Sequence, residues 1–69
     1  MAQRAALFTV RQHQTPEFGV IIEPMSRGTA LIRRGFAIEA RRRPFARATG
    51  VCLRLSEAGL RYILEIENG

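Results

Sequence analysis

The sequence predicts a small α+β domain made of a helix, a short strand, a second helix, a β-hairpin and a C-terminal helix. Three observations predict it. Apolar residues fit helical spacing near both ends of the chain, β-branched or alternating apolar stretches lie between them, and Pro or Gly separates successive segments. With 69 residues in all, the whole chain, residues 1–69, fits one domain.

The first segment covers residues 2–14. Its apolar residues fit either one stripe of a helix or one face of a strand, so periodicity does not decide between them. The segment has no Gly or Pro and begins with Ala and Gln, which favours a helix. Pro16 then ends this helix, because the residue before a proline is pushed out of helical space.

The middle of the chain predicts a strand followed by a helix. Residues 18–23 are rich in β-branched side chains and lie between Pro16 and Pro24, which is typical of a short buried strand. Ser26 is positioned to cap a helix over residues 27–34, and Gly35 stands where a left-handed residue would end it.

The last third predicts a hairpin and a helix. Phe36, Ile38 and Ala40 alternate with more polar neighbours, as the apolar face of a half-buried strand would. Residues 42–50 contain Pro44 and Gly50 and predict a long turn, and residues 51–55 alternate again as the returning strand. Ser56 is the expected cap of the final helix.

The positive charge is concentrated in one stretch. Residues 27–47 hold seven Arg and one Glu, a net +6, whereas the other residues hold four Arg and five Glu, a net −1, and together these give +5. Such asymmetry indicates a polyanionic partner, most often a nucleic acid. Every basic residue is Arg, which suits bidentate phosphate and guanine contacts but also fits the codon bias of a GC-rich genome.

Two stretches resemble a known family. TALIRRGFAIEARRR (residues 29–43) is similar to the end of the recognition helix and the first wing strand of small winged helix-turn-helix regulators. VCLRLSEAGLRYI (residues 51–63) resembles their second wing strand and the start of the next helix. The resemblance covers about half of the chain and implies a winged-helix-like DNA-binding domain.

The resemblance also implies which residues meet DNA. In that family the helix before the wing enters the major groove, and the hairpin tip touches phosphates or the minor groove. Carried onto this sequence, the helix contacts would come from Arg27, Thr29, Arg33 and Arg34. The wing contacts would come from Arg41, Arg42, Arg43 and Arg47. One stretch departs from the family, because residues 16–24 predict a strand where a complete helix-turn-helix has another helix.

Two functions follow as alternatives. The first is a small basic transcriptional regulator that contacts duplex DNA through residues 27–47. The second is a phage- or plasmid-type modulator of a host enzyme, which docks its basic surface on an acidic host protein; the missing helix favours it. RNA binding is a weaker third option, with stacking offered by Phe36 and Phe45. Arg33 and Arg34 also suit the negative end of their own helix.

Composition points away from several other classes. Cys52 and His13 are the single residues of their kinds and there is no Asp, so we expect no disulfide, metal site or cofactor. The six Glu form no paired constellation, and we expect no enzymatic activity. No apolar run is long enough for a membrane span, and residues 1–10 do not look like a signal peptide. A free thiol then favours a cytoplasmic protein.

We expect a homodimer, because a chain of this length buries little core of its own. The last helix is apolar on two sides. Leu60, Ile63 and Leu64 form one stripe, and Tyr62 and Ile66 fall on another. We expect a helix of this kind to pack against two partners, the core of its own chain and a second subunit. The expected dimer contacts are Tyr62, Ile63 and Ile66.

Overall fold

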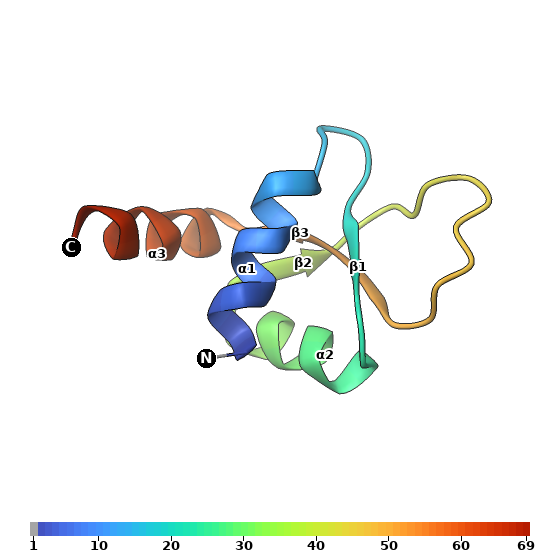
Figure 1. Cartoon of the computed structure of the whole chain (residues 1–69), viewed down its shortest axis with the longest axis horizontal. Helices are drawn as coiled ribbons and strands as arrows, with labels where there is room; N and C mark the ends of the chain where they lie inside the picture. Colours follow the sequence, from blue (N-terminus) through green and yellow to red (C-terminus); the bar gives the residue numbers. More distant parts are fainter. Residues whose placement is uncertain (1) are drawn as a thin grey trace.

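The computed structural model describes residues 2–69, and it confirms a small α+β fold (Figure 1). The three strands form one antiparallel sheet in the order β1-β3-β2. The elements are α1 (Ala2–His13), β1 (Val20–Ile22), α2 (Met25–Arg33), β2 (Ala37–Glu39), β3 (Val51–Leu55) and α3 (Glu57–Asn68). The predicted order of helix, strand, helix, hairpin and helix is therefore correct.

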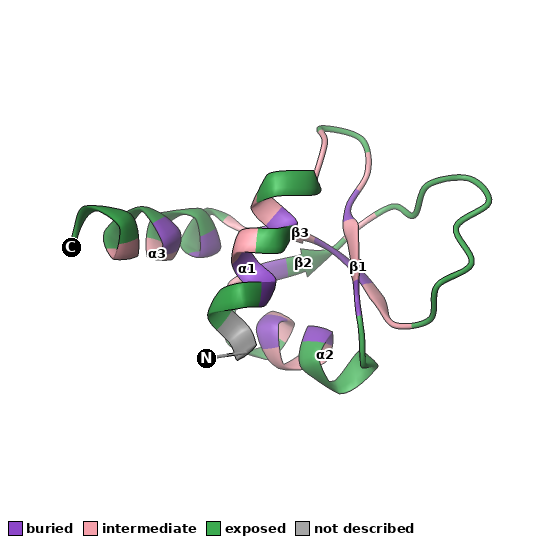
Figure 2. Ribbon diagram, in the orientation of Figure 1, coloured by how far each residue is buried: buried purple, intermediate pink, exposed green. Residues whose placement is uncertain are grey.

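The core lies between one face of the sheet and the two helices α1 and α2. Leu53 in the central strand is fully buried, and Leu7 of α1 and Leu31 of α2 are fully buried in the same cluster. Gly28 lets α2 approach the sheet closely, because a Cβ at this position would lie 2.9 Å from the Cβ of Val51. Figure 2 shows the buried residues on the inner sides of these elements.

The register of the hairpin corrects the expected face of β2. Ala37 pairs with Leu55, and Ile38 pairs with Arg54. Because side chains of paired residues share a face, Ala37 points into the core with Leu55, and Ile38 points away from it. Ala37 is accordingly 3% exposed and Ile38 51% exposed. The alternation in the sequence was real, but the larger apolar side chain lies on the outer face.

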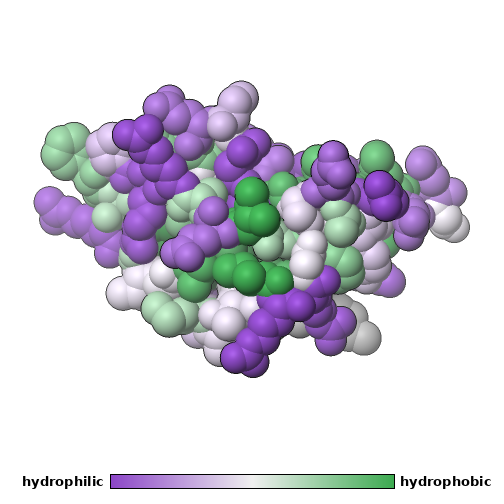
Figure 3. All heavy atoms as spheres, turned by 180° about the vertical axis from the view of Figure 1, so that it is seen from behind, coloured by the Kyte–Doolittle hydropathy of each residue, from purple (hydrophilic) through white to green (hydrophobic). Residues whose placement is uncertain are grey.

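Within the described residues 2–69, no helix covers the outer face of the sheet, since both α1 and α2 pack on the other side. Ile21, Ile38 and Cys52 belong to this outer face by register. Figure 3, which views the molecule from behind, shows an apolar area near the middle of this view, bordered by hydrophilic atoms.

The start of α2 also differs from the prediction. The helix begins at Met25 with Pro24 as its N-cap residue, and no side chain caps it. Ser26 therefore lies inside the first turn and is not the cap. At the other end the prediction was correct, because Gly35 follows the helix with a φ of +80°.

Helix α3 is attached to the sheet at its first two turns. Ser56 caps it by accepting a hydrogen bond from the Gly59 amide at 3.1 Å, as predicted. The Ser56 amide in turn donates to the carbonyl of Phe36 at 3.1 Å. The rings of Phe36 and Tyr62 stack, with centroids 4.7 Å apart and planes inclined by 9°.

The far end of α3 is held by an ion pair with α1. Arg11 donates two hydrogen bonds of 2.7 Å to the carboxylate of Glu67. These bonds, more than the bare charge of Arg11, hold the pKa of Glu67 below its ordinary value. Helix α3 otherwise runs outward from the sheet (Figure 1). Among the helices of residues 2–69, none has both the length and the apolar character needed to cross a bilayer.

Candidate nucleic-acid interface

The outer side of α2 carries most of the predicted helix contacts. A shallow hollow of about 550 Å³ runs along this side of the helix. Its described lining residues are Met25, Ser26, Thr29, Ala30, Arg33 and Arg34. Three of the four residues expected to meet the major groove therefore lie around one surface depression. Arg27 is exposed on the first turn of the same helix but does not line the hollow.

The helix presents this side because its other side is buried. Gly28 and Leu31 are the buried residues of α2, and they face β3 and the core. Gly28 and Leu31 are three positions apart and share one side of the helix, and Arg33 and Arg34 are exposed beyond that side. The arginines at the end of α2 thus remain accessible, and they also lie at the negative end of its dipole, where cations are favoured.

The other predicted contacts lie in residues 40–50, which join β2 to β3 and which we call the arginine loop. Residues 41–49 are all exposed (Figure 2). The loop is attached to the body of the chain at Arg41 and is closed by a bond within it. The carbonyl of Arg41 accepts a hydrogen bond from the amide of Gly19 at 3.0 Å and one from the thiol of Cys52 at 3.3 Å. The guanidinium of Arg42 donates to the carbonyl of Ala48 across the loop.

Two of the loop arginines turn back toward the sheet. The guanidinium carbons of Arg41 and Arg43 lie 5.8 and 5.2 Å from the centroid of the Phe18 ring. Arg41 also lies 3.5 Å from the carboxylate of Glu17. Both members of that ion pair are largely exposed, so the pair contributes little to stability.

The structure therefore divides the eight predicted residues into two groups. One lies on α2, and the other lies on the arginine loop, where Arg41 and Arg43 bend away from the tip. The two elements meet where the loop ends, because a Cβ on Gly50 would lie 2.9 Å from the Cγ of Glu23, just before α2. Among the described side chains (residues 4–69), no ion pair or side-chain hydrogen bond engages Arg27, Arg33, Arg34 or Arg47. These four are the arginines best placed to meet an anion.

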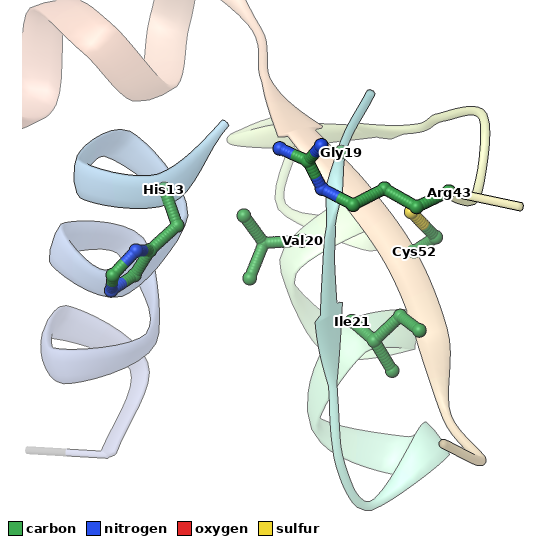
Figure 4. Close-up of a pocket in the computed structure, with 6 residues that line it drawn as sticks. All are labelled: His13, Gly19, Val20, Ile21, Arg43 and Cys52. Atoms are coloured by element: carbon green, nitrogen blue, oxygen red, sulfur yellow. The ribbon is translucent and has the colours of Figure 1, made fainter. Parts of the chain in front are cut away.

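A second hollow, of about 290 Å³, lies beside β1 (Figure 4). Its described lining residues are His13, Gly19, Val20, Ile21, Arg43 and Cys52. Figure 4 shows the Arg43 side chain crossing in front of β1, with His13 on the neighbouring helix α1. The Cys52 side chain is buried, and its thiol donates a hydrogen bond to the Arg41 carbonyl, so Cys52 serves as a small residue of the strand. Nothing in the sequence pointed to this hollow, because its residues come from four separate stretches of the chain.

The expected dimer contacts on α3 need correction. Ile63 is fully buried in the core of its own chain, so it cannot meet a second subunit. Tyr62 is stacked on Phe36, and Ile66 is half-buried. The exposed apolar residues of α3 are instead Leu60, at 39%, and Leu64, at 54%. Neither was among the expected dimer contacts.

The reason is the spacing of the contacts that attach α3. Gly59, Tyr62, Ile63 and Ile66 recur at helical spacing and form one side of the helix. Gly59 permits close approach to Phe36, and Tyr62 stacks on the ring of Phe36. That side therefore packs against the body of the chain. From the sequence, a glycine in the first turn was the signal that could have identified it.

No further clustering of chemically active groups is present in the described part of the chain. Within residues 2–69, no three His, Cys, Asp or Glu side chains come together as metal ligands would. Comparison of the chain with protein-family models, with curated proteins and with solved structures found no match.

Proposed function

We propose that this chain is a small DNA-binding regulator of winged-helix type, which contacts duplex DNA through α2 and the arginine loop. The observation that carries the proposal is the hollow along α2, where Thr29, Arg33 and Arg34 lie together and accessible. The order of α2, β2, the arginine loop, β3 and α3 also matches what the family resemblance implies.

The contact would differ from that of a complete helix-turn-helix. Residues 23 and 24 alone connect β1 to α2, so no helix directly precedes α2 in this chain. The binding surface consists of one helix and the adjoining loop. Arginine contacts to phosphates supply the affinity, and Thr29, the uncharged predicted contact at the hollow, would supply selectivity where it reaches a base edge.

A salt titration of binding to duplex DNA tests the proposal. If each of four arginines contacts one phosphate, the logarithm of the association constant should fall with the logarithm of the salt concentration with a slope of about −3.6. The four arginines are Arg27, Arg33, Arg34 and Arg47. The measurement is the anisotropy of a labelled duplex between about 50 and 200 mM salt. Affinity that does not change over this range would refute the proposal.

Substitutions locate the surface. The double change Arg33→Ala and Arg34→Ala should reduce the slope by about 1.8, because two phosphate contacts are lost. The triple change of Arg41, Arg42 and Arg43 to Ala should reduce it by less than three contacts would, because these side chains are already engaged with Phe18 and Ala48. Arg61→Ala, on the exposed side of α3, is the matched control and should leave the slope unchanged.

The second candidate is a modulator that binds an acidic host protein. The exposed apolar side chains of Ile38, Leu60 and Leu64 favour it, because a protein partner can cover them and a phosphate backbone cannot. Capture from a cell extract with and without nuclease separates the two. The modulator hypothesis is supported if one partner protein is still captured after nuclease treatment and is no longer captured by the Arg33→Ala, Arg34→Ala variant.

A further inference from the structure

The tip of the arginine loop presents an aromatic ring to solvent. Phe45 is 96% exposed. The other phenylalanines are engaged: Phe36 stacks on Tyr62, Phe18 lies under Arg41 and Arg43, and Phe8 lies under Arg11. A ring left in water gains nothing from the hydrophobic effect, so folding does not explain its presence at the tip.

The backbone at Phe45 strengthens this point. Residues 43–46 form a tight turn, in which the amide of Ala46 donates to the carbonyl of Arg43 at 3.2 Å. Pro44 occupies the second position and Phe45 the third, with a φ of +66°. Proline at the second position of a turn and a positive φ at the third position are the pattern of a type II turn, in which glycine is favoured at the third position. A bulky side chain in this conformation is an outlier, and such outliers concentrate at functional positions.

The surroundings of the ring indicate what it meets. Arg42, Arg43 and Arg47 lie within three residues of it, and the carbonyl of Arg41 is held by the amide of Gly19 and the thiol of Cys52. Arg42 is bonded to Ala48 and Arg43 turns back to Phe18, so Arg47, two residues from the ring, is the loop arginine left without a described partner beside this apolar tip. Its complement is an apolar, stackable surface bordered by anions, which describes a base step between two phosphates. A membrane surface fits less well, because the tip offers one aromatic side chain and binding to a bilayer needs a larger apolar area.

We propose that Phe45 is a wedge that enters the minor groove of duplex DNA, inserts between adjacent base pairs and bends the duplex. The inference rests on the proposed function and adds a residue and a mode of contact to it. Apolar wedges of this kind partly unstack a base step and kink DNA by about 20–90°. Arg47, beside the tip, would then neutralise a phosphate next to the opened step.

The absence of tryptophan from the sequence provides the test. Phe45→Trp places a single indole at the tip, and Ala58→Trp places one on the exposed side of α3 as a matched control. Titration with a short duplex should quench the emission at position 45 and shield it from acrylamide, because a stacked indole is covered by bases. The emission at position 58 should stay unchanged.

Affinity and bending give independent readouts. Phe45→Ala should weaken binding by about 5- to 160-fold, as loss of one stacked aromatic side chain does, and should leave the salt slope unchanged. Arg47→Ala should instead reduce the slope by about 0.9. Energy transfer between dyes at the two ends of the duplex should report bending by the natural chain and loss of that bend in Phe45→Ala. Circular dichroism of each variant verifies that the fold is intact.

The outcomes are distinguishable. Suppose that the natural chain binds duplex DNA with the expected salt slope, but the indole at position 45 is not quenched and Phe45→Ala binds and bends DNA like the natural chain. The proposal that Phe45 is a wedge is then wrong, and the proposed function is unaffected. If the natural chain does not bind duplex DNA even at low salt, both proposals fail. A blue shift of the position 45 indole on anionic phospholipid vesicles, without quenching by DNA, would overturn the wedge in favour of a membrane contact.

Discussion

Replacing Gly59 by alanine should destabilise the protein, although the same change in most helices is stabilising. Gly59 lies in the first turn of α3, where the helix passes over the backbone of Phe36. A Cβ at this position would lie well inside van der Waals contact of the Phe36 carbonyl oxygen and 3.0 Å from its carbonyl carbon. The obstacle is backbone, so it cannot rotate away as a flexible side chain would.

The magnitude follows from three effects. Alanine gains at most about 1 kcal/mol over glycine in helix propensity. Forcing an extra methyl group into a packed contact costs about 1–3 kcal/mol. Moving the Phe36 carbonyl also weakens the hydrogen bond that it accepts from the Ser56 amide, a loss of about 1 kcal/mol. The net destabilisation is then about 1–3 kcal/mol, a large part of the roughly 3–10 kcal/mol expected for a chain of this length.

Thermal unfolding followed by circular dichroism measures this effect. Each kcal/mol lowers the midpoint by roughly 4–8 °C in a domain of this size. Ala58→Gly, at the exposed neighbouring position, is the control and should cost less than about 1 kcal/mol. A Gly59→Ala variant as stable as the natural chain, or more stable, would show that α3 does not pass over Phe36 as closely as described.

Two further predictions concern α3. Ile63→Ala should lower the free energy of unfolding by about 2–5 kcal/mol and Leu64→Ala by no more than about 0.5, as judged by urea titration, because Ile63 is fully buried and Leu64 is 54% exposed; equal effects would contradict the assigned packing side. Glu67→Gln should destabilise the chain at neutral pH and have no effect in strong acid. Its pKa is lowered in the folded chain by the hydrogen bonds from Arg11, so the stabilisation is complete above the ordinary pKa of 4.5 and is lost as the pH falls through the lowered value. A difference between natural chain and variant that persists in strong acid would mean that another interaction is responsible.

The elements of the fold were largely predictable because their signals are local. Proline at 16 and 24, glycine at 35 and the Ser56 cap mark boundaries through the backbone of neighbouring residues, and these boundaries were located to within a few positions. The cap of α2 was misplaced because Ser26 is a good cap by type, whereas the helix already begins after Pro24. Such differences of one or two residues depend on where the chain enters the helix, which neighbouring elements decide.

Which side of an element is buried was predicted less well. On β2 the outer position was given to Ala37 and the inner one to Ile38, and pairing with β3 reversed them. On α3 the side containing Tyr62 and Ile63 was assigned to a partner, and stacking on Phe36 placed it against the core. On α3 two sides were apolar enough that composition could not choose between them, and on β2 the pairing with β3 overrode the alternation.

The candidate site shows the same division. The concentration of arginine in residues 27–47 is a property of the sequence, and it indicates a polyanionic partner without any structure. From the sequence alone, these arginines could not be distinguished from one another. The structure separates those engaged with Phe18 and Ala48 from the four left accessible, and it presents Phe45 at the tip of the loop.

The fold class, the order of the elements and the location of the charge could be predicted from the amino acids, because each depends on residue type and on spacing along the chain. Which helix side is core, which arginines are accessible and that one aromatic ring points into solvent became known from the folded chain. These depend on contacts such as Phe36 with Tyr62 and Arg43 with Phe18, which join residues far apart in the sequence. Their partners are chosen by the packing of the whole chain, which no local pattern encodes.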